Sequence, residues 1–387
     1  MTATISFFPV GNGDMTLIQT DSGRNILIDC HIRSGDEHPD VINQLKEKLT
    51  RDSDERLFID LLVWSHPDED HCKGIDEHFH LGSPGDWSDK KDLIFVNEIW
   101  SSPMVYRRAD KNHKLCDDAK ALNREVKRRV KYFEDNKVCD VGNYVLILGN
   151  DENGKTDNIQ DIVMQLDSSR SYINNVNDYG FSARLLGPSP KAELDEDEEK
   201  LGKNHSSVIM NYTITSGSNA VNFLSGGDAE VICWENLLKR MNDNDTKAYL
   251  EYDVLQAPHH CSWHSLSYES LSKAKENGVV AETSVEAIEA LSKAKNSAFI
   301  ISSSNTIEDN EKDPPAYKAK EEYEEIIDKV AGSFKCVNDH KNNNDENVPL
   351  EIVISSTGTK VLSTASIAKS KNAANTAVNR NGGDGYA

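Results

Sequence analysis

An apolar run with a ligand-rich segment at its end constrains the fold of this chain more than any other feature. Residues 57–64 (LFIDLLVW) contain a single charged residue, Asp60, and predict a buried β-strand. Residues 65–71 (SHPDEDH) follow directly and are rich in side chains that can ligate a metal. A strand end holds the following loop rigidly, so ligands spaced one or two positions apart can converge on one or two cations there. This arrangement favours a metal-dependent hydrolase.

The composition is typical of a globular protein without membrane segments. The 387 residues are 37% hydrophobic and 28% charged, enough for one large domain or two ordinary ones. No apolar run approaches the length of a membrane span, and residues 1–6 lack the basic and apolar regions of a signal peptide. The seven cysteines are odd in number, scattered and without a CxxC pair. We therefore expect a reduced, cytoplasmic protein with no membrane association.

The charge balance limits the kinds of partner. The formal net charge of −22 argues against loose, non-specific binding to nucleic acid, because phosphate contacts need clustered Lys and Arg. It does not exclude a phosphate substrate, since a local basic surface and a bound metal can outweigh the global charge close to a site.

Apolar runs and turn residues predict many strands with helices between them. Strands are expected at residues 4–10, 15–20, 25–30, 57–64, 93–96, 144–148, 182–186, 208–212, 220–224, 253–256, 298–301 and 351–354. Helices are expected at residues 38–49, 73–79, 115–134, 229–241, 284–295 and 315–331. This order predicts an α/β (α+β) protein with two sheets whose outer faces are covered by helices.

Three segments stand apart from this pattern. Residues 102–140 and 150–203 read as helical and loop insertions, the second ending in an acidic run. From residue 363 the chain is rich in Ala, Ser, Asn, Thr and Gly with little to bury, which predicts a disordered tail over 363–387. We therefore expect one domain over residues 1–362.

Further ligand candidates lie at the edges of other predicted strands. Asp228 follows the strand at 220–224, and His259 and His260 follow the strand at 253–256. Asn204 and His205 precede the strand at 208–212. One such acid or histidine would more often be a cap or a surface group. Several together, each at a strand edge, favour a shared metal site.

The motifs resemble those of a known family. Residues 66–71 (HPDEDH) are similar to the HxHxDH signature of the metallo-β-lactamase fold, with Asp68 at the position of the second histidine. Residues 8–14 (FPVGNGD) and 27–29 (LID) resemble the "VGQGD…LID" opening of the hydrolase domain of ComEC/Rec2 competence proteins. Later motifs follow in that family's order, at residues 186–188, 204–208, 227–228 and 258–262. The family's last motif is usually HHGS, so Cys261 replaces a glycine.

The resemblance implies a four-layer αββα sandwich with a metal site at the sheet edges. By position, it implies one metal held by His66, Asp68 and the Asn204–His205 element. It implies a second held by Asp70, His71 and His259, with Asp228 bridging the two. Whether His205 or Asn204 is the ligand is left open, His205 being the better donor and Asn204 otherwise a substrate contact. Asp29 is expected to orient a ligand rather than to be one.

The donor types bear on the metal and on catalysis. The Asp68 carboxylate is a harder donor than imidazole and favours Mn²⁺ or Mg²⁺, although Zn²⁺ also accepts aspartate, so one or two ions of Zn²⁺, Mn²⁺ or Mg²⁺ are expected. The alternative for Asp68 is a solvated loop acid. Asp70 and His260 are the predicted catalytic residues, because an imidazole such as His260 could protonate a leaving oxygen. A histidine packed beside the metal loop is the alternative for His260.

The expected helix at 115–134 carries a basic stripe opposite its apolar face. Its members are Arg124, Lys127, Arg128 and Lys131. This stripe could contact a phosphate backbone or a protein partner, but a solvated helix face is the favoured interpretation.

These observations predict hydrolysis by a metal-bound hydroxide, with a phosphodiester in DNA, RNA or a nucleotide as the substrate. One alternative is another hydrolase of the same fold, acting on a lactone, a thioester or a cyclic nucleotide. The other is a non-catalytic module that binds a protein partner.

Overall fold

The structure is a computed structural model that describes residues 2–101, 114–151, 154–190 and 203–362. It is a mixed α/β protein with several sheets and helices, as the sequence predicts at that level. The predicted tail at 363–387 lies outside the described residues, as do residues 102–113 of the first predicted insertion and residues 152–153 and 191–202 of the second.

The first sheet contains nine strands within the described residues. In spatial order they are β19 (Gly358–Val361), β18 (Leu350–Ser355), β1 (Ala3–Phe7), β2 (Thr16–Gln19), β3 (Asn25–Ile28), β5 (Phe58–Val63), β6 (Phe95–Ser101), β7 (Tyr144–Leu148) and β8 (Val163–Met164). Pairing is antiparallel from β19 to β3 and parallel from β3 to β8.

The second large sheet has seven described strands. In spatial order they are β17 (Ser333–Cys336), β16 (Ala294–Ser302), β15 (Tyr252–Gln256), β14 (Asn219–Ser225), β13 (Ile209–Ser216), β12 (Phe181–Gly187) and β9 (Ser169–Arg170). It is parallel from β17 to β14 and antiparallel beyond. A short hairpin, β10 (Tyr172–Ile173) and β11 (Val176–Asn177), forms a separate pair, and β4 (Cys30–His31) makes isolated bridges.

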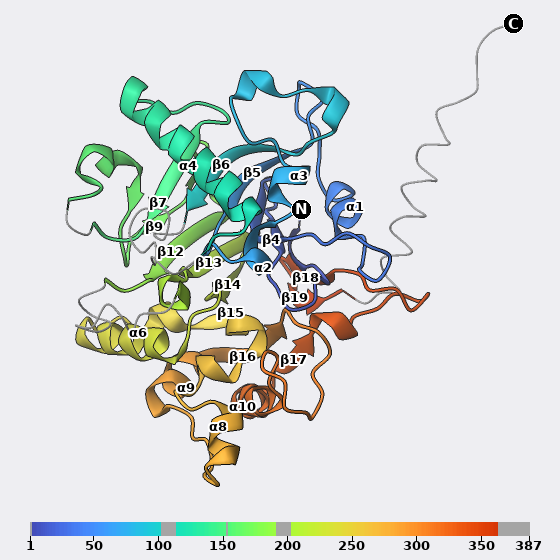
Figure 1. The fold of residues 1–387 in the computed structure, drawn as a ribbon, viewed down its shortest axis with the longest axis vertical. Helices are drawn as coiled ribbons and strands as arrows, with labels where there is room; N and C mark the ends of the chain where they lie inside the picture. Colours follow the sequence, from blue (N-terminus) through green and yellow to red (C-terminus); the bar gives the residue numbers. More distant parts are fainter. Residues whose placement is uncertain (1, 102–113, 152–153, 191–202, 363–387) are drawn as a thin grey trace, which may run out of the picture.

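Helices lie beside both large sheets. They are α1 (Val41–Lys46), α2 (Glu69–Cys72), α3 (Ile75–His78), α4 (Asp117–Asn136), α6 (Val231–Asp243), α7 (Pro258–Cys261), α8 (Leu271–Glu276), α9 (Val285–Leu291) and α10 (Tyr317–Asp328). Figure 1 shows α1 to α4 next to the first sheet, and α6, α8, α9 and α10 beyond the second sheet at the opposite side of the molecule.

The two large sheets face one another across a shared apolar core. That core takes residues such as Phe7 and Val63 from the first sheet, and Phe223 and Val254 from the second. The rings of Phe7 and Phe223 meet edge to face, 5.6 Å apart. A second core joins α1, α3 and α4 to the first sheet, and a third joins α6, α9 and α10 to the second. Burial on both faces explains why the central strands read as continuous apolar runs in the sequence.

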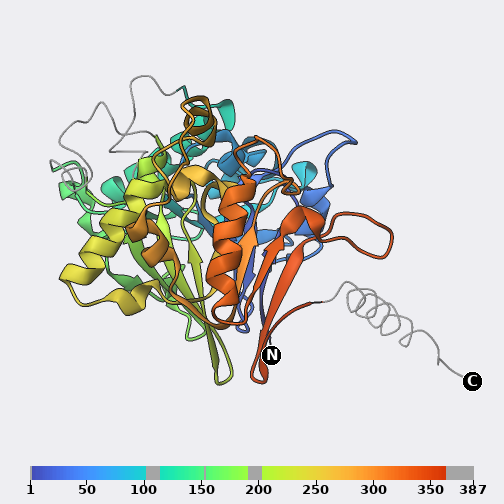
Figure 2. The same cartoon turned by 90° about the horizontal axis from the view of Figure 1, so that it is seen from below.

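Two hairpin turns mark one end of the two large sheets. The β13–β14 and β18–β19 turns project side by side at this end (Figure 2), where the Asn219 side chain donates to Thr359 Oγ1 at 3.0 Å. The parallel strands β3, β5, β14 and β15 run toward the other end, so their carboxyl ends gather away from these hairpins.

Some element bounds differ from the sequence expectation. The helix expected at 73–79 is only the short α3, and a separate helix α2 precedes it, because Lys73 is extended and Gly74 adopts a left-handed conformation with φ of 84°. As a result Asp70 and His71 lie on α2, inside the ligand-rich segment. The helix expected at 284–295 ends at Leu291, where the chain passes into β16.

Helix α4 is held to the first sheet by a buried arginine, paired with a glutamate of the same helix, that the periodicity did not reveal. Arg129 Nε donates to Glu125 Oε1 at 2.7 Å, and the Arg129 guanidinium donates to the carbonyls of Val96, Asn97 and Tyr144 at 2.9–3.0 Å. Among the described helices, none is long and apolar enough to cross a membrane.

Candidate metal centre

Four parallel strands deliver the site residues to one end of the two sheets. Asp29 follows β3, and residues 65–71 follow β5, in the first sheet. Asp228 follows β14, and His259 follows β15, in the second sheet. Loops at the carboxyl ends of parallel strands are a common place for ligand sites, because rigid strands position them. The site is therefore built between the sheets rather than on one of them.

The described residues contain three groups whose ligand atoms lie within 4.8 Å of one another. The first consists of Asp70, His71, Asp228 and His260, the second of His66, Asp68 and Asp228, and the third of Asp14, Asp29 and His71. Nearly all of these side chains are buried, and Asp70 is half-buried. Such groups could hold a metal ion, because imidazole and carboxylate are ordinary ligands of divalent cations.

The centre of the arrangement is Asp228, which is 2% exposed. Its Oδ1 lies 3.0 Å from His71 Nε2 and 3.4 Å from His260 Nε2. Its Oδ2 lies 3.4 Å from His66 Nε2 and 3.6 Å from His259 Nε2. One carboxylate thus faces four imidazoles, two on each oxygen, and it is the member that the first two groups share.

Asp29 and Ser65 fix the orientation of His71. The His71 Nδ1 atom lies 2.7 Å from Asp29 Oδ2, which leaves Nε2 toward Asp228. Ser65 donates to Asp29 twice, from its backbone N at 2.8 Å and from its hydroxyl at 2.5 Å. A carboxylate behind a ligating histidine fixes the ring and makes it a better donor. This is the orienting contact that the sequence interpretation assigned to Asp29.

Asp14 holds an equivalent position behind His260, and the sequence analysis did not name it as a site residue. Its Oδ1 lies 3.3 Å from His260 Nδ1, and its backbone N donates to the Asp70 carbonyl at 3.1 Å. The His260 Nε2 atom lies 3.3 Å from Asp70 Oδ2. Neither nitrogen of His260 reaches hydrogen-bond geometry, although the ring is only 1% exposed. The sequence signal that could have identified Asp14 is its position as the acidic residue at the end of the turn at residues 11–14.

The loop that carries the two histidines has an unusual backbone. His259, His260 and Cys261 all have left-handed φ values, of 50°, 54° and 66°. For residues other than glycine this conformation costs about 1–2 kcal/mol each. Strain of this kind persists only where the surroundings impose it, and it is often found at functional sites. Gly227 also has a positive φ, 49°, and lies directly before Asp228.

The charges of the site are mutually stabilising. Burial lowers the pKa of His260, but Asp228 and Asp14 outweigh it and raise that pKa to about 10. Burial and His71 lower the pKa of His66, but the Asp228 and Asp68 carboxylates raise it to about 8. Burial alone would raise the pKa of Asp228, yet the surrounding imidazoles hold it well below its ordinary value. The carboxylates therefore create a strong local preference for positive charge.

His259 differs from the other histidines. Burial lowers its pKa below the ordinary value, so it is neutral near pH 7. Its backbone N donates to the Gly227 carbonyl at 2.9 Å, which ties this loop to the one carrying Asp228. Its Nδ1 atom is buried and makes no hydrogen bond. A neutral imidazole is the form that ligates metals, so a cation at His66 and His260 would displace their protons. Because the buried carboxylates attract positive charge in either form, the residues present fit a divalent cation.

Asn204 and His205 face a different acid. Both lie on the 3₁₀ turn η6 (Lys203–Ser206), where Asn204 Nδ2 donates to Glu230 Oε1 at 3.0 Å. His205 Nε2 lies 3.2 Å from Glu230 Oε2. Neither residue belongs to the three groups formed by the described part of the chain. The ligand role of this element stays a prediction, and Glu230 is a neighbour that spacing could not reveal.

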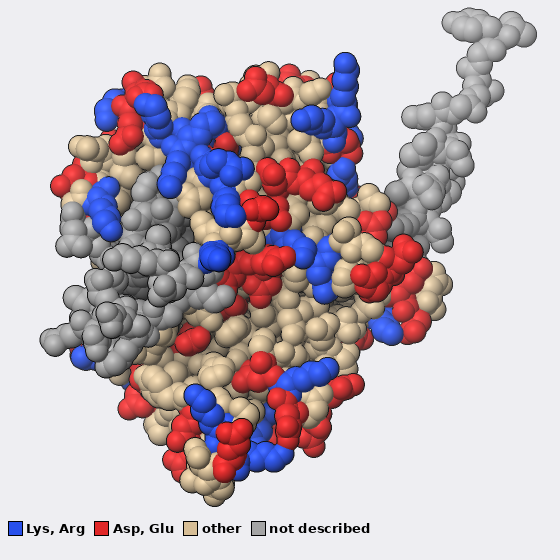
Figure 3. Space-filling model, in the orientation of Figure 1, with Lys and Arg blue, Asp and Glu red and all other residues tan. Residues whose placement is uncertain are grey.

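The predicted basic stripe is partly neutralised on α4. Arg128 donates to both oxygens of Glu125 at 2.7–2.8 Å and to Asn143, and Lys131 pairs with Asp135 at 3.0 Å. Arg124 and Lys127 are exposed. Figure 3 shows Lys and Arg side chains gathered over α4 on the face that also carries a cluster of acids. The surface over this helix is thus locally basic in a strongly acidic protein.

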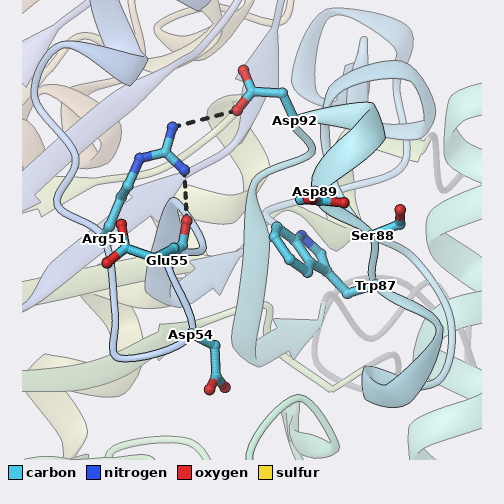
Figure 4. A pocket seen from close by; sticks show the side chains of 7 residues that line it. All are labelled: Arg51, Asp54, Glu55, Trp87, Ser88, Asp89 and Asp92. Carbon is cyan, nitrogen blue, oxygen red and sulfur yellow. Dashed lines mark hydrogen bonds and ion pairs between the residues drawn. The ribbon is translucent and has the colours of Figure 1, made fainter.

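One pocket lies apart from the three candidate ligand groups. Its volume is about 440 Å³, and it is lined by Arg51, Asp54, Glu55, Trp87, Ser88, Asp89 and Asp92 (Figure 4). Arg51 spans it, donating to the Glu55 carbonyl at 2.6 Å and lying 3.5 Å from Asp92. The pocket contains none of the candidate ligands.

Comparison with known proteins assigns neither a family nor a function to this chain. A scan against protein-family models finds no match, and a search of curated proteins finds none either.

Proposed function

We propose that this chain is a metal-dependent hydrolase that cleaves phosphodiester bonds. The observation that carries the proposal is Asp228, a buried carboxylate shared by two ligand groups. A carboxylate between two sets of His and Asp ligands is the arrangement expected of a bridging residue. Buried charges at this density are costly unless they are paired or bind a metal.

The arrangement of the sheets supports a four-layer αββα sandwich of the metallo-β-lactamase type. Two sheets share a core, and the other two apolar cores join helices to their outer faces. The ligand groups lie at the sheet ends, where the resemblance to the hydrolase domain of ComEC/Rec2 proteins expects them. We include this family relationship in the proposal.

The side chains have distinct roles in this scheme. A divalent cation bound there would supply positive charge that activates water and neutralises charge developing on a leaving oxygen. His71 would ligate the cation through Nε2, because Asp29 fixes its Nδ1 atom. The Asp14 carboxylate lies 3.3 Å from His260 Nδ1 and attracts that ring electrostatically, without the hydrogen bond that Asp29 makes. Asp228 would offer a carboxylate oxygen to each of the two ligand groups, and Asp68 would add a hard oxygen donor beside His66. Protonation of the leaving oxygen by His260 stays a prediction.

The phosphodiester assignment rests on two features. Two ligand groups with a common carboxylate suit a pair of cations, and pairs of cations serve in-line attack at phosphorus in many nucleases. The exposed side chains of Arg124 and Lys127 add positive charge on α4, whose N-terminus packs near α2. In a protein of net charge −22, such a local basic surface gives a phosphate backbone one favourable approach.

The test combines metal analysis with substrate assays. The purified protein is dialysed with Zn²⁺ or Mn²⁺, its bound metal is measured by mass spectrometry, and it is offered linear DNA, RNA, bis-p-nitrophenyl phosphate and a lactone. The variant His71→Asn removes a central imidazole. The matched control His80→Asn changes another buried histidine, whose Nε2–H donates to the Ser83 carbonyl at 2.9 Å and which belongs to none of the three groups.

We expect bound metal and phosphodiester turnover in the wild type and in His80→Asn, and loss of both in His71→Asn. A wild-type protein that binds no divalent cation above background contradicts the hydrolase proposal. Metal binding with lactone hydrolysis and no phosphodiester turnover contradicts the substrate assignment alone.

A further inference from the structure

Two cysteine side chains meet where the last residue of α2 contacts the N-cap residue of α4. The Sγ atoms of Cys72 and Cys116 lie 3.7 Å apart. Cys72 is fully buried and follows the candidate ligand His71, whereas Cys116 is half-buried at the N-cap of α4. They are separated by 44 positions in the sequence, so only the packing of α2 against α4 brings them together.

Each thiol is held by a backbone group. The Cys72 thiol donates to the Asp68 carbonyl at 3.0 Å, and the Ala119 backbone N donates to Cys116 Sγ at 3.3 Å. The second contact belongs to the first turn of α4, where free N–H groups and the helix dipole favour a negative charge. Cys72 and the Ala119 N–H lower the pKa of Cys116 to about 7 against the effect of burial.

We propose that Cys72 and Cys116 form an oxidation site that hydrogen peroxide converts into a disulfide, and that this disulfide weakens cation binding at α2. The pair needs to close from 3.7 Å to the disulfide length of about 2.05 Å, a change within reach of side-chain rotation and a small shift of the short helix α2. The half-buried Cys116 is the sulfur that peroxide can reach first.

The chemistry balances in two steps. The Cys116 thiolate attacks one peroxide oxygen, the O–O bond breaks, and hydroxide leaves and is protonated to water, so that sulfur is oxidised to a sulfenic acid. The Cys72 sulfur then attacks Cys116 sulfur, an S–S bond forms, and the S–O bond breaks. The leaving oxygen departs as water with the Cys72 proton. Two thiols and one peroxide thus give one disulfide and two waters.

The disulfide is expected to weaken cation binding because the Cys72 thiol loses its hydrogen bond to the Asp68 carbonyl. Disulfide formation consumes the Cys72 proton that now binds the Asp68 carbonyl. It also ties the end of α2 to α4, and α2 carries Asp70 and His71. Loss of a contact that supports metal ligands typically costs about 10- to 100-fold in metal affinity. This consequence rests on the proposed metal-binding function, whereas the disulfide itself does not.

The experiment compares three proteins before and after hydrogen peroxide treatment. They are the wild type, Cys116→Ser and the control Cys30→Ser, which changes a buried thiol on β4 next to Cys72. Serine at 116 retains an N-cap oxygen, so α4 keeps its capping contact. Intact mass and tryptic peptide mapping report the disulfide, and a Zn²⁺ titration against a chromophoric chelator reports affinity, with dithiothreitol added to reverse the oxidation.

We expect the wild type and Cys30→Ser to lose two hydrogen atoms, to yield a linked 72–116 peptide, and to lose Zn²⁺ affinity by about 10- to 100-fold until reduced. Cys116→Ser should keep its affinity. Failure to detect the 72–116 link, or equal loss of affinity in Cys116→Ser, overturns the proposal. A disulfide that leaves the affinity unchanged overturns its regulatory part. If reduced wild type binds no Zn²⁺ but the disulfide forms, the proposed function has failed and the oxidation site stands.

Discussion

Replacing Asp228 by asparagine removes one negative charge from the centre of the site while keeping the side-chain shape. The Asp228 oxygens lie 3.0–3.6 Å from four imidazole nitrogens, so a cation bound by those imidazoles would be within a few ångströms of the carboxylate. One pair of unit charges at 4 Å is worth about 4 kcal/mol at an effective dielectric constant of 20. Because 1.4 kcal/mol is a factor of ten and a divalent cation doubles this interaction, the variant should bind the cation at least about a thousandfold more weakly.

The assay is a competition titration of Zn²⁺ and Mn²⁺ against a chromophoric chelator, with metal content measured in parallel. Asp60→Asn is the matched control, since Asp60 is equally buried on β5 but pairs with Arg24 at 2.7 Å outside the three groups. We expect normal metal binding in the control. Unchanged stoichiometry and affinity in Asp228→Asn would refute the bridging role, and an equal loss in both variants would show that any buried charge deletion disturbs the site.

Three further predictions concern other contacts. Arg129→Met removes a buried donor from three backbone carbonyls of the first sheet and leaves Glu125 paired with Arg128, so it should lower the free energy of unfolding by about 3–5 kcal/mol, measured by urea denaturation. Asp29→Asn should weaken metal binding about 10- to 100-fold, because an amide holds the His71 ring less firmly. Alkylation of Cys116 by iodoacetamide should accelerate with rising pH and be half-maximal near pH 7, since the thiolate reacts and its pKa is about 7. In Cys72→Ala this midpoint should move to higher pH.

Each prediction has its own control. Lys131→Met, at an exposed position of the same helix, should change stability by less than about 0.5 kcal/mol, and equal effects at 129 and 131 would contradict the anchoring role. Asn tolerates the left-handed backbone at position 29, where φ is 55°, so unfolding in urea should be little changed by Asp29→Asn. An alkylation midpoint that stays the same in Cys72→Ala would show that the neighbouring thiol does not lower the pKa of Cys116.

The local pattern of apolar and polar residues in the sequence predicted most of the helices and strands. The run at 57–64 became β5, and the apolar positions of the helix expected at 115–134 became the buried face of α4, Asp117–Asn136. These features depend on burial and periodicity within a few residues, which the sequence carries directly. The motif at 65–71 likewise identified side chains that the structure brings into buried groups. The ligand roles and the family relationship remain predictions.

Only the tertiary structure decided which of these side chains meet. Asp228 lies 157 positions from His71, and their contact depends on how the two sheets pack. The same packing set Asp14 behind His260 and paired His205 with Glu230. It also imposed three successive left-handed residues at 259–261. Spacing along the chain determines on which face of a strand or helix a side chain lies. Whether side chains from distant strands meet depends on the register and packing of the sheets, which no local pattern encodes.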